Sequence, residues 1–223
     1  MTSKRLDHFG KVNRDRVVSF TWDNKKLFGY EGDSLASALL ANDIKVVGRS
    51  FKFHRPRGIM SCGVEESGAL VTVGKGNRRD PNVRATTQEL YEGLISSGQN
   101  AFPSVNFDFG AVTGLLSRFF AAGFYYKTFM GIPPFEWGKG TKIWMFYEKL
   151  IRRAAGMGVA SRLPDPDQYE HANDFCDVLV VGSGPAGIAA AQEAADKKLD
   201  VILVEQEPII GGEKLAENNF DSE

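Results

Sequence analysis

The sequence predicts an α+β fold followed by the beginning of an α/β fold. Within residues 13–93, a pair of β-prone segments, a short apolar helix and further β-prone segments follow one another. Within residues 173–223, an apolar strand, a glycine-rich turn and an alanine-rich helix come in immediate succession. Hairpins followed by a helix and more strands indicate an α+β domain, whereas strand, helix and strand in alternation indicate a parallel sheet.

The first β-prone segments lie at residues 17–23 and 27–31, and a turn centred on Asn24 separates them. A helix comes next, which Asp33 or Ser34 can cap. Its apolar positions on one side are Leu35, Ala38, Leu39 and Leu40. Residues 69–73 and 83–91 predict further strands. This order is that of a small β-grasp domain, the fold of plant-type ferredoxins, preceded by a tail at residues 1–12.

A plant-type [2Fe–2S] cluster needs three thiolates spaced C-x4-C-x2-C and a distant fourth. The loop after the predicted helix has the expected position and glycine content, but its one cysteine is Cys62. One thiolate cannot hold a cluster, so we expect no iron–sulfur centre and a small, buried Cys62. The three histidines are scattered along the chain and predict no metal site.

The same loop is basic, and two interpretations stay open. Its charged side chains are Lys45, Arg49, Lys52, Arg55 and Arg57, with His54 among them. They can form a solvated face that Glu65 and Glu66 partly balance. Alternatively, a turn through Pro56 and Gly58 directs Arg55 and Arg57 together toward an anion or a partner protein.

Residues 94–172 form an aromatic-rich connecting segment. Between Phe102 and Tyr147 lie 14 aromatic residues, which suit either a core between two domains or a surface for another subunit. A helix is predicted at 142–155, capped by Thr141, and a polar, proline-containing linker follows it. The apolar stripe of this helix comprises Trp144, Tyr147, Leu150 and Ile151.

The apolar run at 176–181 predicts a strand that is covered on both faces. Gly182, Gly184 and Gly187 then form G-x-G-x-x-G, the fingerprint of Rossmann-type dinucleotide sites. Gly182 allows the tight turn, Gly184 lets the backbone approach a pyrophosphate, and Gly187 brings helix and strand close together. The start of the helix offers free N–H groups to the phosphates.

The second strand, at 200–205, ends in Glu205, whose carboxylate can accept hydrogen bonds from adenosine ribose hydroxyls. The same carboxylate would repel a 2′-phosphate, so NADP is disfavoured, but NAD and FAD are not separated. The turn and the Gly211–Gly212 doublet are typical of two-dinucleotide flavoproteins, which favours FAD. The candidate cofactor-binding residues are Gly182, Ser183, Gly184, Pro185, Ala186, Gly187, Glu205, Gln206 and Gly212.

Composition argues against several classes of partner. The formal net charge is −1, so the basic excess of a nucleic-acid-binding or membrane-surface protein is missing. The apolar stretch from Gly114 to Phe135 is interrupted by charges and prolines and does not predict a membrane span. Two cysteines and no apolar leader predict a cytoplasmic protein.

Several segments resemble a known family. They are "YEGDSLASALLANDIKVVGRSFKFHRPRGIMSCGVEESGALV", "RATTQELYEGL", "SGQNAFPSVNFDF", "AGFYYKTFM" and "FYEKLIRRAAGMG". Nearly the whole chain is similar to the N-terminal part of the α subunits of heterotetrameric sarcosine oxidases. The resemblance implies an αβγδ assembly that oxidatively demethylates sarcosine to glycine, forming hydrogen peroxide and a one-carbon unit that tetrahydrofolate accepts.

The resemblance also distributes the cofactors. It implies NAD in the α subunit, held here by Gly182, Gly184, Gly187 and Glu205, with FAD in β, FMN at the α–β interface and zinc in δ. The amine-oxidising site lies in the β subunit, so no catalytic residue is expected in this chain.

Family α subunits are several times longer, with a folate-binding region downstream. We therefore expect the chain to be a truncated piece, with residues 173–223 poorly ordered in isolation because two strands leave apolar faces uncovered. Two alternatives stay open: a FAD-binding subunit of an opine or amine dehydrogenase, and a non-catalytic interaction module with a vestigial nucleotide site.

Overall fold

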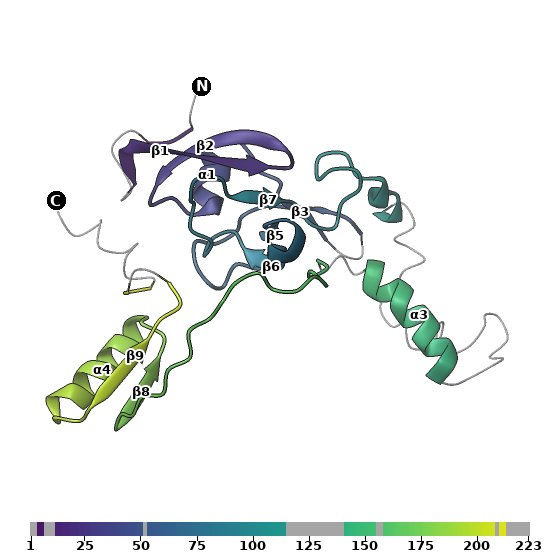
Figure 1. Ribbon diagram of the computed structural model, residues 1–223. Coiled ribbons are helices and arrows are strands. Elements are labelled where there is room, and N and C mark those ends of the chain that lie inside the picture. Colours follow the sequence, from purple (N-terminus) through teal and green to yellow (C-terminus); the bar gives the residue numbers. More distant parts are fainter. Residues whose placement is uncertain are drawn as a thin grey trace. The chain divides into compact units, whose positions relative to one another are not determined.

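The computed structural model describes residues 4–6, 12–50, 53–114, 141–154, 158–207 and 210–212. The chain divides into two compact units, Met1–Pro166 and Asp167–Glu223 (Figure 1). The densest part of the aromatic segment, residues 115–140, lies outside the described residues. Within the described part, no helix has both the length and the apolar character needed to cross a bilayer.

The first unit is built on a five-stranded mixed sheet with the order β2-β1-β7-β5-β6. Its strands are β1 (Asn13–Trp22), β2 (Lys25–Glu31), β5 (Leu70–Val73), β6 (Asp80–Arg84) and β7 (Ile95–Ser97). β1 and β7 run parallel, and the other pairs are antiparallel. The predicted hairpin turn is confirmed: Asp23 and Asn24 have φ of 45° and 66°, the left-handed conformation that a two-residue hairpin loop requires.

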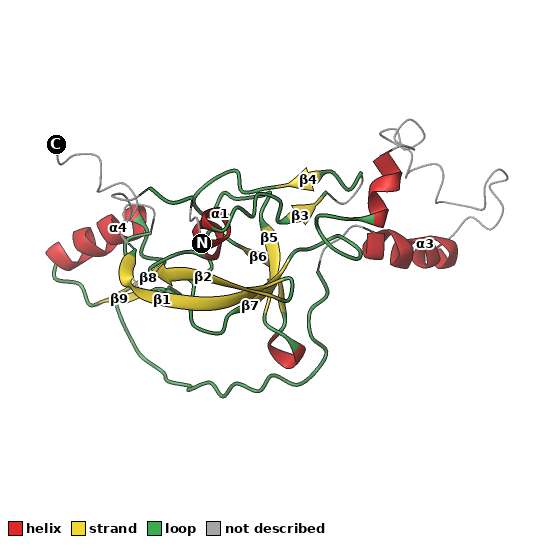
Figure 2. Ribbon diagram, turned by 90° about the horizontal axis from the view of Figure 1, so that it is seen from above, coloured by secondary structure: helices red, strands yellow, loops and turns green. Residues whose placement is uncertain are grey.

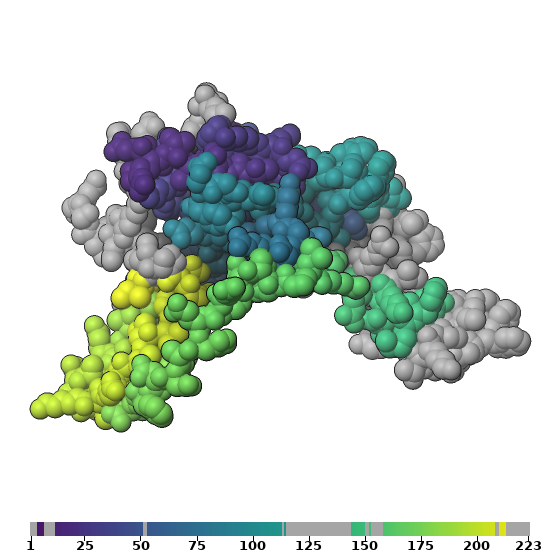
Figure 3. Space-filling model, in the orientation of Figure 1, coloured from purple at the N-terminus to yellow at the C-terminus, as the bar shows by residue number. Residues whose placement is uncertain are grey.

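Helix α1 (Leu35–Ala41) contributes to the core of this unit, and Figure 2 shows it beside the sheet. Ser34 caps the helix by accepting a hydrogen bond from the Ser37 amide (3.2 Å), as one of the two predicted caps. Leu35 and Leu39 are fully buried, whereas Leu40 is 45% exposed. In the space-filling view, the β1–β2 hairpin (purple) and the teal residues up to 114 form one continuous body (Figure 3).

Asp33, the other predicted cap, has a different role. Its carboxylate is 1% exposed, pairs with Arg5 and accepts hydrogen bonds from the Tyr30 amide (2.8 Å) and the Ser37 hydroxyl (2.6 Å). It therefore ties residues 4–6 to the turn before the helix.

Two strand predictions need correction. The strand expected at 83–91 ends at Arg84, because the carbonyls of Ala85 and Gln88 accept from the amides of Ala36 and Leu35 at the start of α1. β7 was not predicted; it is three residues long, and two of them are serines. The strand expected at 69–73 is confirmed as β5.

Beyond this core, β3 (Gly48–Arg49) and β4 (Pro56–Arg57) form a small antiparallel ribbon. The predicted helix is confirmed as α3 (Thr141–Ala154), although Thr141, the predicted cap, is its first residue. Trp144 and Tyr147 are half-buried, and Phe146 is exposed. The short 3-10 turns η1 (Gly76–Arg78) and η2 (Phe109–Gly114) complete the described elements of this unit.

In the second unit, β8 (Val178–Val181) and β9 (Val201–Val204) are parallel neighbours, and α4 (Pro185–Asp196) connects them. This confirms the predicted α+β-then-α/β fold class. The expectation that the first strand is covered on both faces is wrong for this chain: Leu179 is 59% and Val181 79% exposed. α4 is the one described helix of this unit, so it covers a single face of the strand pair.

Candidate dinucleotide-binding site

The glycine-rich turn joins the end of β8 to the start of α4. Gly182 has φ of 96°, a conformation that side chains disfavour, and its amide donates to the carbonyl of Val204 at the end of β9 (2.7 Å). Gly184 is the N-cap of α4 and carries no side-chain cap, and Pro185 occupies the first position of the helix. The amides of Ala186 and Gly187 lie in the first helical turn, where no intrahelical acceptor exists, so they are available to an anion.

The glycines of the turn differ in the space around them. A Cβ on Gly184 would enter open space, so nothing in the described residues obstructs the predicted approach of a pyrophosphate to this backbone. A Cβ on Gly187 would overlap the carbonyl oxygen of Gly182, so only glycine permits this helix–strand contact. Gly212 lies beside the turn, because a Cβ there would be 3.1 Å from the Cα of Gly184.

Glu205 follows β9 directly, and its carboxylate is bound by four protein donors. Oε2 accepts from the amide and the hydroxyl of Ser183 (2.6 Å each). Oε1 accepts from the amides of Gln206 (2.8 Å) and Glu207 (3.1 Å). The Ser183 hydroxyl, followed by these amides, lowers the pKa of Glu205 from 4.5 to about 2, so the side chain is a permanent anion at neutral pH.

These bonds qualify the predicted role of Glu205. A carboxylate offers about four lone-pair sites, and all four directions are already used by protein donors. Ribose hydroxyls must therefore share an oxygen with one of these donors or displace it. Ribose binding by Glu205 stays a prediction, whereas its position at the end of β9 beside the phosphate turn is observed.

Ser183 connects three parts of the site, a role that the motif did not reveal. Its side chain is fully buried, its hydroxyl donates to Glu205, and the Gly211 amide donates both to its carbonyl (3.1 Å) and to its hydroxyl (3.3 Å). It thus joins the turn, the acid and the glycine doublet. The remaining predicted residues, Pro185, Ala186 and Gln206, lie at the same edge and are exposed.

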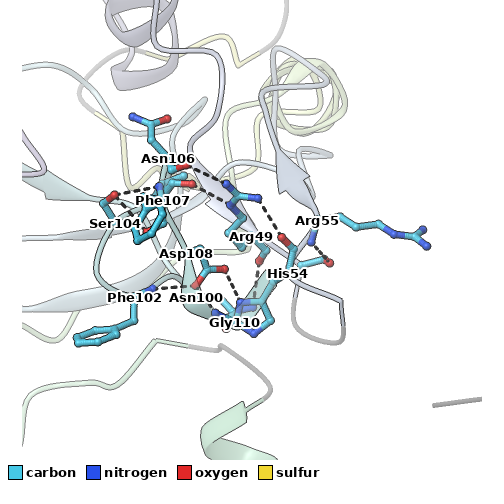
Figure 4. Close-up of polar contacts among 12 residues, drawn as sticks. Arg49, His54, Arg55, Asn100, Phe102, Ser104, Asn106, Phe107, Asp108 and Gly110 are labelled. Carbon is cyan, nitrogen blue, oxygen red and sulfur yellow. Dashed lines mark hydrogen bonds and ion pairs between the residues drawn. The ribbon is translucent and has the colours of Figure 1, made fainter. Parts of the chain in front are cut away.

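The basic loop of the first unit is organised by the polar contacts of Arg49, His54 and Asp108 (Figure 4). Arg49 donates to the carbonyls of Val105 (2.8 Å), His54 (3.1 Å) and Asn106 (3.4 Å). Its guanidinium is therefore engaged by the protein, and the expectation of a solvated or anion-binding Arg49 is wrong. Arg55 points away from this cluster (Figure 4) and lies 5.0 Å from the Phe53 ring.

The predicted turn at Pro56 is also corrected, because Pro56 and Arg57 form β4. Asp108 accepts from His54 Nδ1 (2.6 Å) and from the amides of Phe102 and Gly110 (3.0 Å each). Burial raises the pKa of Asp108, but these hydrogen bonds outweigh burial and lower it. The cluster holds the loop at 101–110 against β3 and β4.

The cysteine prediction is wrong for Cys62, which is exposed, and Cys176 is partly buried. Among the residues that the structure describes, no group of three or more His, Cys, Asp or Glu side chains could hold a metal ion.

Comparison with known proteins finds a family match within each unit. Residues 15–101 match the family described as "2Fe-2S iron-sulfur cluster binding domain", and residues 177–217 match "FAD dependent oxidoreductase". The chain is 54% identical to the sarcosine oxidase subunit alpha of Rhizobium meliloti (strain 1021), over 97% of this chain and 21% of that protein. It is 33% identical to the subunit of the same name from Corynebacterium sp. (strain U-96), over 91% of this chain and 16% of that protein.

These similarities confirm the resemblance to sarcosine oxidase α subunits, and the chain spans about a fifth of the length of these relatives. Among solved structures, the chain is similar to L-proline dehydrogenase from P. horikoshii, with a TM-score of 0.44 and 21% identity over 90% of this chain and 27% of that one. At that score the likeness supports no conclusion about function.

Proposed function

We propose that this chain is the N-terminal part of the α subunit of a multisubunit sarcosine oxidase, in which it binds a dinucleotide and contacts the partner flavin subunits. The sequence identity over 97% of the chain supports the family, and the turn at 182–187 supports the nucleotide role. The whole assembly would convert sarcosine to glycine, with hydrogen peroxide and a one-carbon unit for tetrahydrofolate as further products. The β, γ and δ subunits are the expected partners, and the cytoplasm is the proposed location.

The observation that carries the nucleotide role is the combination of open space over Gly184 with free amides at the start of α4. The N–H groups of Ala186 and Gly187 would donate to the diphosphate, and the helix dipole would favour its charge. Gly212 limits the space on the other side of Gly184. The described residues therefore fit the ADP half of a dinucleotide.

The identity of the dinucleotide depends on two lines of support. The "FAD dependent oxidoreductase" match favours FAD, whereas the resemblance to sarcosine oxidase α subunits implies NAD. Both contain the same ADP group, and both have an unphosphorylated adenosine ribose. The ionised Glu205 disfavours NADP, because a 2′-phosphate beside it would be repelled.

A bound FAD or NAD supplies a hydride acceptor or donor. In this proposal the chain's role is to position the cofactor. The backbone of 182–187 holds the diphosphate, Ser183 orients Glu205, and Glu205 fixes the ribose end of the site. No described residue is assigned to the bond-breaking step.

The test is a Gly184→Val substitution in the full-length subunit, purified with its partners. A side chain at this position occupies the place of the pyrophosphate, so we expect at least a tenfold loss of the bound dinucleotide. Ala190→Val, on an exposed position of the same helix, is the matched control and should retain the cofactor. Released nucleotides are separated by chromatography after denaturation.

The outcome also separates the two cofactors. Loss of NAD with unchanged flavin identifies NAD at this site, and loss of one flavin equivalent identifies FAD, as in the dehydrogenase-type alternative. Unchanged content of both cofactors would reject the site. It would favour the interaction-module alternative, in which pull-down of the β subunit survives deletion of residues 173–223.

A further inference from the structure

The loop from Gly58 to Ala69 lies between β4 and β5, in the segment after α1 where a plant-type ferredoxin sequence would have its cluster cysteines. The matched family is described as a cluster-binding domain, yet Cys62 is the one cysteine of residues 15–101. A plant-type [2Fe–2S] cluster needs four thiolates. Cys62 is also exposed, so the residues present do not fit the group that the family description implies.

The interior of this loop holds the carboxylate of Glu66, which is 2% exposed. Its Oε2 accepts from the amides of Met60 (2.7 Å) and Ser61 (2.8 Å), and more weakly from the Ser61 hydroxyl (3.3 Å). Its Oε1 accepts from the amides of Gly68 and Ala69 (3.0 Å for Ala69). Four backbone amides from both ends of the loop thus converge on one carboxylate.

Convergent backbone amides form an anion-binding concavity of the kind that holds phosphates and iron–sulfur clusters. The charge of Glu66 is balanced by these dipoles, and the nearby Arg84 donates instead to the main-chain carbonyl of Glu66 (3.3 Å). The loop is therefore built around an anion that the chain itself provides.

Glycine at position 68 leaves the space that the Glu66 carboxylate needs. A Cβ on Gly68 would lie 2.6 Å from the Gly58 carbonyl oxygen and 3.1 Å from Oε1 of Glu66. Glycine at position 68 therefore allows the backbone at Gly58 and at Gly68 to lie close together beside the Glu66 carboxylate. The Gly63 carbonyl accepts from the Glu66 amide (3.3 Å) and from the Thr86 hydroxyl (2.7 Å), which anchors the outer turn that carries Cys62.

We propose that the Glu66 carboxylate replaces the iron–sulfur cluster as the anion that organises this loop, so that the domain folds without iron. The amide cage is then a binding site for a monocarboxylate, normally filled by the chain's own side chain. Removal of that side chain creates a site for formate or acetate. This inference does not depend on the dinucleotide proposal.

The test measures amide hydrogen exchange of the 58–70 loop in the full chain, by mass spectrometry. In Glu66→Ala we expect the four caged amides, at Met60, Ser61, Gly68 and Ala69, to exchange at least tenfold faster than in the parent chain. Sodium formate should restore part of the protection, whereas sodium chloride at equal ionic strength should not.

Glu65→Ala is the adjacent control, because the Glu65 carboxylate is exposed and is bound on the outer turn, by the Gly63 amide (3.3 Å), the Cys62 amide and the Ser61 hydroxyl. It should leave exchange of the four amides unchanged. Parent-like protection in Glu66→Ala, or equal effects of formate and chloride, would overturn the proposal.

If Glu66→Ala does not fold, the same exchange measurement is made on Glu66→Gln. The NH2 group of its side-chain amide faces backbone N–H donors and cannot accept from them, so the loop amides should still exchange faster than in the parent chain. Parent-like exchange in this variant would overturn the proposal. Anaerobic treatment of the parent chain with iron and sulfide gives a second readout. We expect no visible [2Fe–2S] absorption, and stoichiometric cluster formation would refute the replacement.

Discussion

The buried Glu66 carboxylate predicts a specific loss of stability in acid. Burial raises the pKa of Glu66, but hydrogen bonds from the amides of Ser61, Met60, Gly68 and Ala69 outweigh burial and lower it from 4.5 to about 2. A carboxylate whose pKa is lower in the folded than in the unfolded chain stabilises the fold above the unfolded pKa. This contribution is lost as the pH falls from about 4.5 toward about 2.

The magnitude follows from the size of the shift. Each pKa unit corresponds to about 1.4 kcal/mol, so a fall from 4.5 to about 2 corresponds to about 3 kcal/mol of unfolding free energy at neutral pH. Glu66→Gln cannot titrate at this position. We therefore expect the stability advantage of the parent chain over this variant to shrink by about 3 kcal/mol as the pH falls from 7 toward 2.

Urea unfolding of both chains from pH 7 to pH 3, followed by circular dichroism, measures this difference. The nearby Arg84 and Glu65 are present in both chains, so their charges do not differ between the two. Glu65→Gln is the control and should show a smaller pH-dependent difference, because the Glu65 carboxylate is exposed, although hydrogen bonds from its own amide and the Ser61 hydroxyl also lower its pKa. A difference between parent and Glu66→Gln that stays constant from pH 7 to pH 3 would refute the reasoning.

Three further predictions concern the core and the nucleotide site. Leu39→Ala should lower the free energy of unfolding by roughly 2–5 kcal/mol, whereas Leu40→Ala, at a half-exposed position, should cost less than about 1 kcal/mol in the same urea titration. Ser183→Ala should weaken dinucleotide binding by the full-length subunit about tenfold, measured by calorimetry, because Glu205 loses a charge-assisted hydrogen bond; an unchanged affinity would show that Ser183 does not orient the site. Gly187→Ala should abolish that binding, since the added methyl group overlaps the Gly182 carbonyl, and retained affinity would contradict the close helix–strand contact.

Local patterns predicted much of the fold. The hairpin turn at Asp23–Asn24, the helix capped by Ser34 and the strand–turn–helix around Gly182 are encoded by residues next to one another in sequence. Such signals are visible without tertiary structure. The strand ending at Arg84 and the short β7 depend instead on pairing with distant elements, which residue preference cannot reveal.

The sequence did not predict which side chain of the 58–69 loop is buried. Cys62 was expected to be buried, whereas Glu66 was expected to balance part of a solvated basic face in one of the two open interpretations. In the structure Glu66 is buried, because four backbone amides compensate its charge, and Cys62 is exposed on the outer turn. The donors are backbone groups, which have no signature in the sequence.

The 58–69 loop and the turn at 182–187 each bind a carboxylate of the chain in a similar way. Glu66 accepts from four backbone amides and one hydroxyl, Glu205 accepts from three backbone amides and one hydroxyl, and each has its pKa lowered to about 2. They differ in what remains free. The amides around Glu66 converge on that carboxylate alone, whereas Glu205 leaves the first-turn amides of α4 available. The 58–69 loop therefore already holds its anion, the Glu66 carboxylate, whereas the turn at 182–187 still has amides that can bind one.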